Sequence, residues 1–170
     1  MKNMIVSVIF ILNVFIASCG AAPIPPRADN FSFIYKDFAC DLIPFYVLDS
    51  AKQTLIHSPV DNVNEYEFPF VLTDEELDAI YQKAISIDFF EYSSPFVVPE
   101  DQMLGYQFPI SNFDLYLING EKSNLVAWTN GIMAKPSYKA FKNLEELQEL
   151  INRIIQSREI QLPVSSAGCE

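Results

Sequence analysis

The sequence LTDEELDAIYQKAISI, residues 72–87, decides the fold because it carries the clearest local signals in the chain. Thr73 is followed three residues later by Glu76, the spacing of a capping box, in which each side chain accepts a hydrogen bond from the other residue's backbone N–H. Acidic residues in the first turn suit the positive end of the helix dipole. The apolar residues that follow recur every three or four positions and form one helical face. We therefore predict an amphipathic helix from Thr73 to about Ile87.

Three segments upstream of this helix have the composition of β-strands. Aromatic residues occupy alternate positions of residues 31–38, which is the period of a strand with one buried face. Residues 43–48 and 54–57 are short apolar runs separated by a polar turn, and we predict a strand for each. Residues 58–70 contain two prolines and two asparagines, so we predict a loop there.

Downstream of the helix, residues 93–109 hold three prolines, Gly105 and no clear period, which predicts a long loop. Residues 113–118 and 123–128 have the pattern of two strands. The dipeptide Asn119-Gly120 between them favours a hairpin, because both residue types accept positive φ.

Aromatic side chains gather around the predicted 93–109 loop. They either cover the edge of the sheet as core residues or form a recognition surface, since aromatic residues are favoured in interface cores. These residues are Phe89, Phe90, Tyr92, Phe96, Tyr106 and Phe108.

A second helix is predicted to begin at Asn143, with Glu146 in the capping-box position and residues 129–142 as the preceding connector. The element order is then strands, helix, strands, helix. This order predicts an α+β fold with an antiparallel sheet of about four to five strands and both helices packed on one face.

The amino-terminal residues 1–18 have the pattern of a secretory signal peptide. Lys2 precedes an uncharged apolar run that ends near Ser18. The alternative is a transmembrane anchor, which would need about 20 apolar residues, more than this run contains.

The run ends in Ile16-Ala17-Ser18-Cys19, a branched apolar residue and two small residues before a cysteine. This motif resembles the lipobox of bacterial lipoproteins. The resemblance implies that Cys19 receives acyl chains, that cleavage precedes it and that the acyl chains hold the protein in the membrane. The alternative is ordinary signal cleavage after Ala21 or Ala22, which leaves Cys19 on the discarded peptide.

The remainder divides into three parts. Residues 19–30 form a lipid-attached, proline-rich tether, expected to be semi-rigid polyproline II that could hold the domain roughly 30 Å from the membrane. Residues 31–163 form one α+β domain, and residues 164–170 form a C-terminal tail. If Cys19 carries lipid, Cys40 and Cys169 remain, and an exported compartment permits a disulfide between them. The alternative is two unpaired cysteines.

The formal net charge is −11, and loss of Lys2 would make it −12. No cluster of Lys and Arg could neutralise phosphates, so we expect no nucleic-acid partner. His57 is the only histidine, which excludes zinc sites with several imidazoles. There is also no glycine-rich phosphate loop and no Gly-x-Ser-x-Gly elbow. We expect no catalytic set, cofactor or metal site.

Several segments are also similar to small exported domains of unknown function in bacterial lipoproteins. The resemblance spans most of residues 70–155 and implies no catalytic residues. It includes the helix from Thr73, the Ile87-Asp-Phe-Phe exit, the Asn119-Gly120 hairpin, Val126-Ala-Trp and the late helix with Leu144 and Leu147.

The sequence therefore predicts a lipid-anchored protein of the bacterial cell envelope, facing the periplasm or the exterior. We expect a binding or scaffolding role, with acyl chains on Cys19 in the membrane and an envelope protein as a possible partner. The two alternatives are an envelope hydrolase that uses His57, and an inhibitor or immunity-type protein that acts through residues 93–109.

Overall fold

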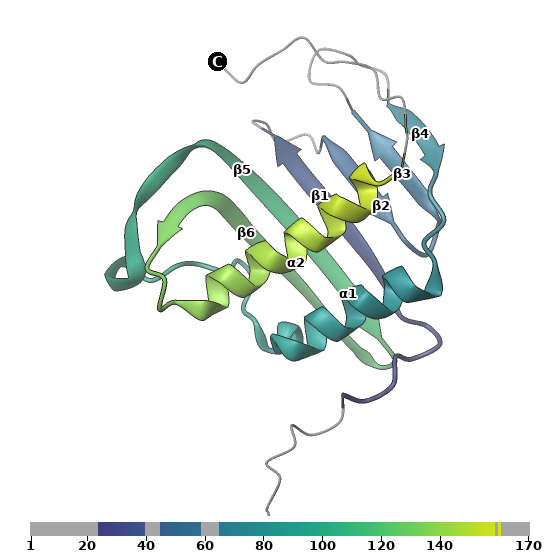
Figure 1. The fold of residues 1–170 in the computed structure, drawn as a ribbon, viewed down its shortest axis with the longest axis horizontal. Helices are drawn as coiled ribbons and strands as arrows, with labels where there is room; N and C mark the ends of the chain where they lie inside the picture. Colours follow the sequence, from purple (N-terminus) through teal and green to yellow (C-terminus); the bar gives the residue numbers. More distant parts are fainter. Residues whose placement is uncertain (1–23, 40–44, 59–64, 159, 161–170) are drawn as a thin grey trace, which may run out of the picture.

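The structure is a computed structural model that describes residues 24–39, 45–58, 65–158 and 160. These residues form one antiparallel sheet of six strands in the order β4-β3-β2-β1-β5-β6, together with two helices (Figure 1). The strands are β1 (Ser32–Ala39), β2 (Tyr46–Asp49), β3 (Thr54–His57), β4 (Tyr66–Pro69), β5 (Met103–Asn119) and β6 (Lys122–Ala134). The helices are α1 (Asp74–Ser86) and α2 (Lys139–Gln156), with 3-10 turns η1 (Phe89–Glu91) and η2 (Glu100–Gln102). The predicted α+β class is confirmed, whereas four to five strands is too few.

Helix α1 begins as its sequence predicts. The Thr73 hydroxyl accepts a hydrogen bond from the Glu76 backbone N–H at 3.2 Å, and a Glu76 carboxylate oxygen accepts one from the Thr73 N–H at 2.8 Å. The helix buries Ile80, Tyr81 and Ala84. The predicted capping box is therefore confirmed.

Helix α2 begins at Lys139, so the predicted start at Asn143 is wrong. The residue before the helix, Tyr138, makes no capping hydrogen bond with its side chain. Phe141 is buried in the core, and tertiary burial of this turn extends the helix beyond the local capping signal. Glu146 pairs instead with Lys83 of α1 and thereby links the two helices.

Strands β5 and β6 are longer than predicted: β5 also includes residues 103–112, and β6 also includes residues 129–134. The β5–β6 register is irregular between Tyr106 and Ser111. Such an irregularity breaks the period-two pattern, and this explains why the sequence predicts a loop and a connector there. Strand β4 lies inside the predicted 58–70 loop, which is a further correction.

The hairpin turn itself is displaced by one residue. Asn119 pairs with Lys122, so Gly120 and Glu121 form the turn, and of the residues from 119 to 122 only Gly120 has positive φ, at 65°. One positive φ at the first central position is the requirement of a type II′ turn.

The core lies between the sheet and the helices, which Figure 1 shows side by side in front of the strands. The Tyr35 hydroxyl of β1 donates to the Asn152 side chain of α2 at 3.1 Å. Phe31, just before β1, packs edge-on against Tyr81 of α1. Strand alternation places Phe31 and Tyr35 on the same side of the chain, so both helices contact the side of the sheet to which β1 turns these residues.

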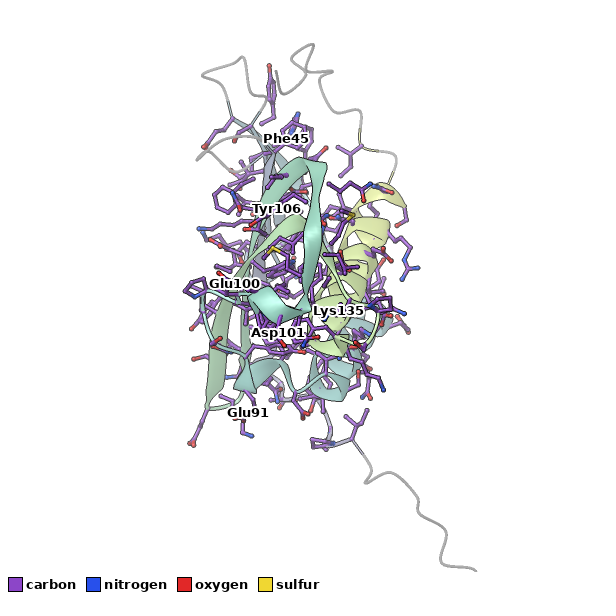
Figure 2. The ribbon with its side chains drawn as sticks, turned by 90° about the vertical axis from the view of Figure 1, so that its left-hand side faces the viewer. Phe45, Glu91, Glu100, Asp101, Tyr106 and Lys135 are labelled. Atoms are coloured by element: carbon purple, nitrogen blue, oxygen red, sulfur yellow. The ribbon has the colours of Figure 1, made fainter. Side chains whose placement is uncertain are left out.

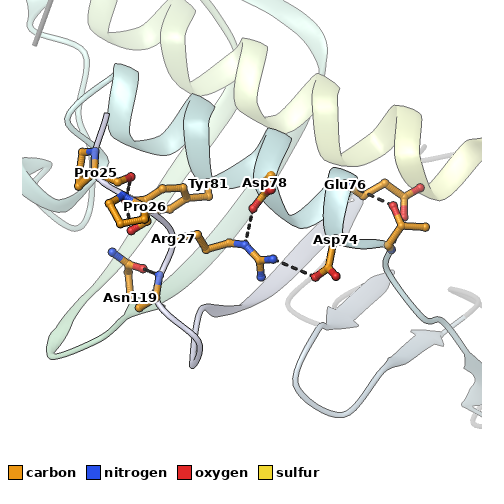
Figure 3. Close-up of polar contacts among 10 residues, drawn as sticks. Pro25, Pro26, Arg27, Asp74, Glu76, Asp78, Tyr81 and Asn119 are labelled. Atoms are coloured by element: carbon orange, nitrogen blue, oxygen red, sulfur yellow. Dashed lines mark hydrogen bonds and ion pairs between the residues drawn. The ribbon is translucent and has the colours of Figure 1, made fainter. Parts of the chain in front are cut away.

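Residues 24–30 lie against the folded domain (Figure 3). The Tyr81 hydroxyl of α1 donates to the Pro25 carbonyl at 2.9 Å, and Arg27 forms ion pairs with Asp74 and Asp78. The Ala28 N–H donates to the Asn119 side chain at 2.9 Å. The proline-rich segment therefore runs along α1 and the β5–β6 turn from residue 24 onward, because its backbone groups find partners there.

No helix within the described ranges is long and apolar enough to cross a membrane.

We predict that Thr73→Ala lowers the free energy of unfolding by about 1 kcal/mol, because the Glu76 N–H at the helix start loses its acceptor. Chemical denaturation monitored by circular dichroism measures the change. Thr73→Ser is the matched control, since it keeps the hydroxyl and should remain close to wild type. Equal losses in the two variants would contradict the capping role.

Candidate functional site

Polar side chains from three adjacent strands form a row across the sheet. Asp37 of β1 pairs with Tyr46 of β2, and Tyr46 pairs with His57 of β3. Asp37 lies two residues after Tyr35, whose hydroxyl contacts α2, so strand alternation turns Asp37 toward the same helix. Three residues separated in the sequence thus lie side by side near the end of β1.

A cavity of about 250 Å³ lies between two members of this row, Asp37 and Tyr46, and the C-terminal end of α2. We call it the Asp37 cavity. Its described lining combines one carboxyl group, one phenol, two amides, one guanidinium and two aliphatic side chains. Its lining residues are Asp37, Tyr46, Asn152, Ile155, Gln156, Arg158 and Ile160.

Burial dominates the electrostatics of Asp37 and raises the pKa of its carboxyl group to about 6. Among the described residues, no Lys, Arg or His nitrogen lies within 4.0 Å of that carboxyl group. Burial also raises the pKa of the Tyr46 hydroxyl, and the negative charge of Asp37 raises it further. A partly desolvated carboxyl group in a cleft, with a perturbed pKa, is typical of a functional site.

Arg158 lines the cavity, but its charge is directed elsewhere. Its guanidinium binds both carboxylate oxygens of Glu76, one at 2.8 Å, and lies 5.5 Å from the centre of the Phe70 ring. Glu76 in turn belongs to the capping box of α1. This arrangement pairs the arginine with Glu76 rather than with Asp37.

His57 is 1% exposed and lies among aromatic rings. Its ring stacks on Tyr46 with centroids 5.1 Å apart and meets the edge of Phe45 at 4.6 Å. Nδ1 lies 3.2 Å from the Phe45 carbonyl oxygen. The histidine does not line the Asp37 cavity, although its ring supports one of the walls through Tyr46.

The aromatic residues around 93–109 divide between core and surface. Phe89 is buried, and Phe90, Tyr92 and Phe96 pack against the core. Tyr106 of β5 is 58% exposed (Figure 2), and Leu104 of the same strand is 61% exposed. A second cavity of about 330 Å³ lies nearby and includes Phe96 and Trp128 in its lining. Phe108 has no described side chain.

Cys19, Cys40 and Cys169 lie outside the described residues, so lipidation of Cys19 and a disulfide between Cys40 and Cys169 remain predictions. Mass spectrometry of the non-reduced protein tests the bridge, which is absent if both thiols alkylate under denaturing conditions without reductant.

Within the described ranges, no group of three or more His, Cys, Asp or Glu residues is placed to hold a metal ion.

Asp37 was not among the site residues predicted from the sequence. A signal was present, because Asp37 is in phase with Phe31, Phe33 and Tyr35, which are buried. An acidic residue at a position that alternation assigns to the core marks either a strand end or a buried carboxyl group. The sequence could not show that the end of α2 covers this position.

No family model matches the chain, and no curated protein matches it.

We predict that Asp37→Asn raises the free energy of unfolding by about 1–2 kcal/mol at neutral pH, a magnitude reduced for partial exposure. The folded pKa of about 6 lies above the usual value for Asp, so the folded state binds the proton more tightly than the unfolded state. The ionised carboxylate of the wild type therefore costs stability, and this cost grows between about pH 4 and pH 6.

Urea denaturation at about pH 4 and about pH 7.5 measures the difference between the two proteins. The stabilisation should be large at the higher pH and small at the lower one. Glu67→Gln, an exposed change on β4 that removes the same charge, is the control. A destabilised Asp37→Asn variant at neutral pH would contradict the desolvation argument.

Proposed function

We propose that this protein is a lipid-anchored cell-envelope protein that binds a ligand in the Asp37 cavity. The cavity is the observation that carries the binding role. It presents a carboxyl group without a described counterion beside amide and hydroxyl groups and the apolar side chains of Ile155 and Ile160. Binding sites are typically concave, with apolar walls and a few oriented polar groups.

The contacts of residues 24–30 support a specific geometry for the anchored protein. Only four residues separate Cys19 from Ile24, and a fully extended chain covers at most about 3.6 Å per residue. Lipid on Cys19 would therefore hold Ile24 within roughly 20 Å of the membrane surface. Because the segment runs along α1 and the β5–β6 turn, we propose that this end of the sheet faces the membrane.

The Asp37 cavity lies at the other end of β1. Strand β1 starts at Ser32 beside the docked segment, and Asp37 is five residues further on, about 17 Å at the usual rise per residue. Figure 1 shows the start of β1 near the β5–β6 turn and the C-terminal end of α2 at the opposite end of the sheet. In the proposed orientation the cavity opens away from the bilayer.

The inhibitor or immunity-type alternative is favoured by exposed apolar side chains within residues 93–109. Val97, Leu104 and Tyr106, all within residues 93–109, are large apolar side chains exposed to solvent, and aromatic residues are favoured in interface cores. The hydrolase alternative would require access to His57, which is buried beneath Phe45 and Tyr46.

We predict that radiolabelled palmitate enters the wild type and does not enter Cys19→Ser, because the acyl chains attach at that sulfur. Cys40→Ser is the matched control and should retain the label. Recovery of unlabelled wild type that begins at Ala22 or Pro23 would show ordinary signal cleavage and overturn the anchoring proposal.

We also predict that a tryptophan at the membrane-facing end is quenched by brominated phospholipids. Glu121→Trp lies in the β5–β6 turn and should be quenched more strongly than Glu67→Trp on β4, each measured as the difference from the parent protein in the same vesicles. Trp128 is the only native tryptophan, so this subtraction is simple. Equal quenching at both positions would contradict the proposed orientation.

A further inference from the structure

The Asp37 cavity has a charge and a shape that define a class of ligand. We infer that it binds a small aliphatic primary amine, with the ammonium group at the Asp37 carboxylate and the carbon chain against Ile155 and Ile160. This inference rests on the proposed binding role and specifies its ligand.

The negative charge of Asp37 favours a cationic ligand. Asp37 has no cationic partner within 4.0 Å in the described part of the chain, and the arginine that lines the cavity is held by Glu76. An ionised carboxylate that is partly removed from water is stabilised by an opposite charge at short distance. A ligand cation supplies that charge, whereas an anionic ligand would add a second negative charge beside Asp37.

The cavity wall also offers the hydrogen-bond acceptors that an ammonium group needs. An ammonium group donates three hydrogen bonds and accepts none. The wall around Asp37 supplies oxygen acceptors in the Tyr46 hydroxyl and the Gln156 side chain, besides the carboxylate itself. The Asn152 oxygen already accepts from the Tyr35 hydroxyl at 3.1 Å, which fixes the position of this amide beside the cavity.

The described lining of the cavity also favours an ammonium ion over a metal ion. Calcium takes six to eight oxygen ligands, commonly with several carboxylates. Asp37 is the single carboxyl group among the described residues that line the cavity, and the other described lining residues include two isoleucines and an aromatic ring. An alkyl ammonium ion fits both the polar and the apolar part of the lining, because its charged group contacts the carboxylate and its carbon chain contacts the aliphatic side chains. The Tyr46 ring, held by its stacking on His57, adds an aromatic surface that attracts cations.

The test uses the purified full-length lipoprotein in detergent at about pH 7.5, with three probes of matched length: n-butylamine, 1-butanol and butyrate. Ligand-observed NMR gives the affinity, and the midpoint of thermal unfolding gives an independent readout. We expect saturable binding of n-butylamine with a rise in the midpoint. We expect binding of 1-butanol and butyrate to be at least about tenfold weaker, because neither supplies the positive charge.

Asp37→Asn should reduce the affinity for n-butylamine by about tenfold or more, since it removes the charged partner and keeps the size of the side chain. The variant is expected to be more stable than the wild type, so a loss of binding cannot be attributed to unfolding. Tyr46→Phe keeps the ring and should weaken binding by a smaller factor. Glu67→Gln removes an equal charge from the exposed strand β4 and should bind as the wild type does.

Equal binding of 1-butanol and n-butylamine, with retention of both by Asp37→Asn, would overturn the inferred amine class and leave the cavity as a binding site. Absence of binding by all three probes would also overturn it. Both results are distinguishable from failure of the anchoring proposal, which the palmitate and quenching measurements decide separately.

Discussion

The period-two alternation of β1 is the constraint on which the candidate site depends. Phe33 and Tyr35 turn toward the helices and are buried, and Asp37 follows them at the same spacing. The strand cannot direct Asp37 to solvent without a register shift that would also expose the two aromatic side chains. Burial of the aromatic residues therefore fixes the carboxyl group beneath the end of α2.

Desolvation of Asp37 lowers the stability of the fold, and stabilising contacts in the surrounding structure offset this loss. Tyr35 hydrogen bonds to Asn152 across the interface between β1 and α2, and Phe113 of β5 stacks on Tyr35 with centroids 6.2 Å apart. These contacts belong to a well-packed apolar region that can accommodate one unfavourable charge. Sites that bind or react commonly hold such a group, because a ligand interacts more strongly with a charge that water does not already screen.

The docked segment, residues 24–30, makes the two ends of the sheet different, because it contacts the end that holds the β5–β6 turn. Arg27, Asp74 and Asp78 tie the segment to α1, and Asn119 ties it to the β5–β6 turn. Exposed ion pairs contribute little individually. The path of the chain is fixed by two hydrogen bonds to its backbone: the Tyr81 hydroxyl donates to the Pro25 carbonyl, and the Asn119 side chain accepts from the Ala28 N–H. An anchor that precedes this segment would act on the domain at one end, while the cavity lies at the other.

Local signals were sufficient where a few neighbouring residues determine the structure. Thr73 and Glu76 determined the start of α1 because the capping box closes within one turn, and the strand at residues 54–57 has the predicted bounds. The α+β class followed from the order of such elements. Tertiary structure decided where α2 starts, because burial of Phe141 outweighed the capping pattern at Asn143. It also decided the lengths of β5 and β6, because their irregular register hides the period-two pattern of a strand. It also decided the site, because Asp37, Tyr46 and Asn152 meet only when β1 pairs with β2 and α2 covers both, and such long-range contacts leave no local pattern in the sequence.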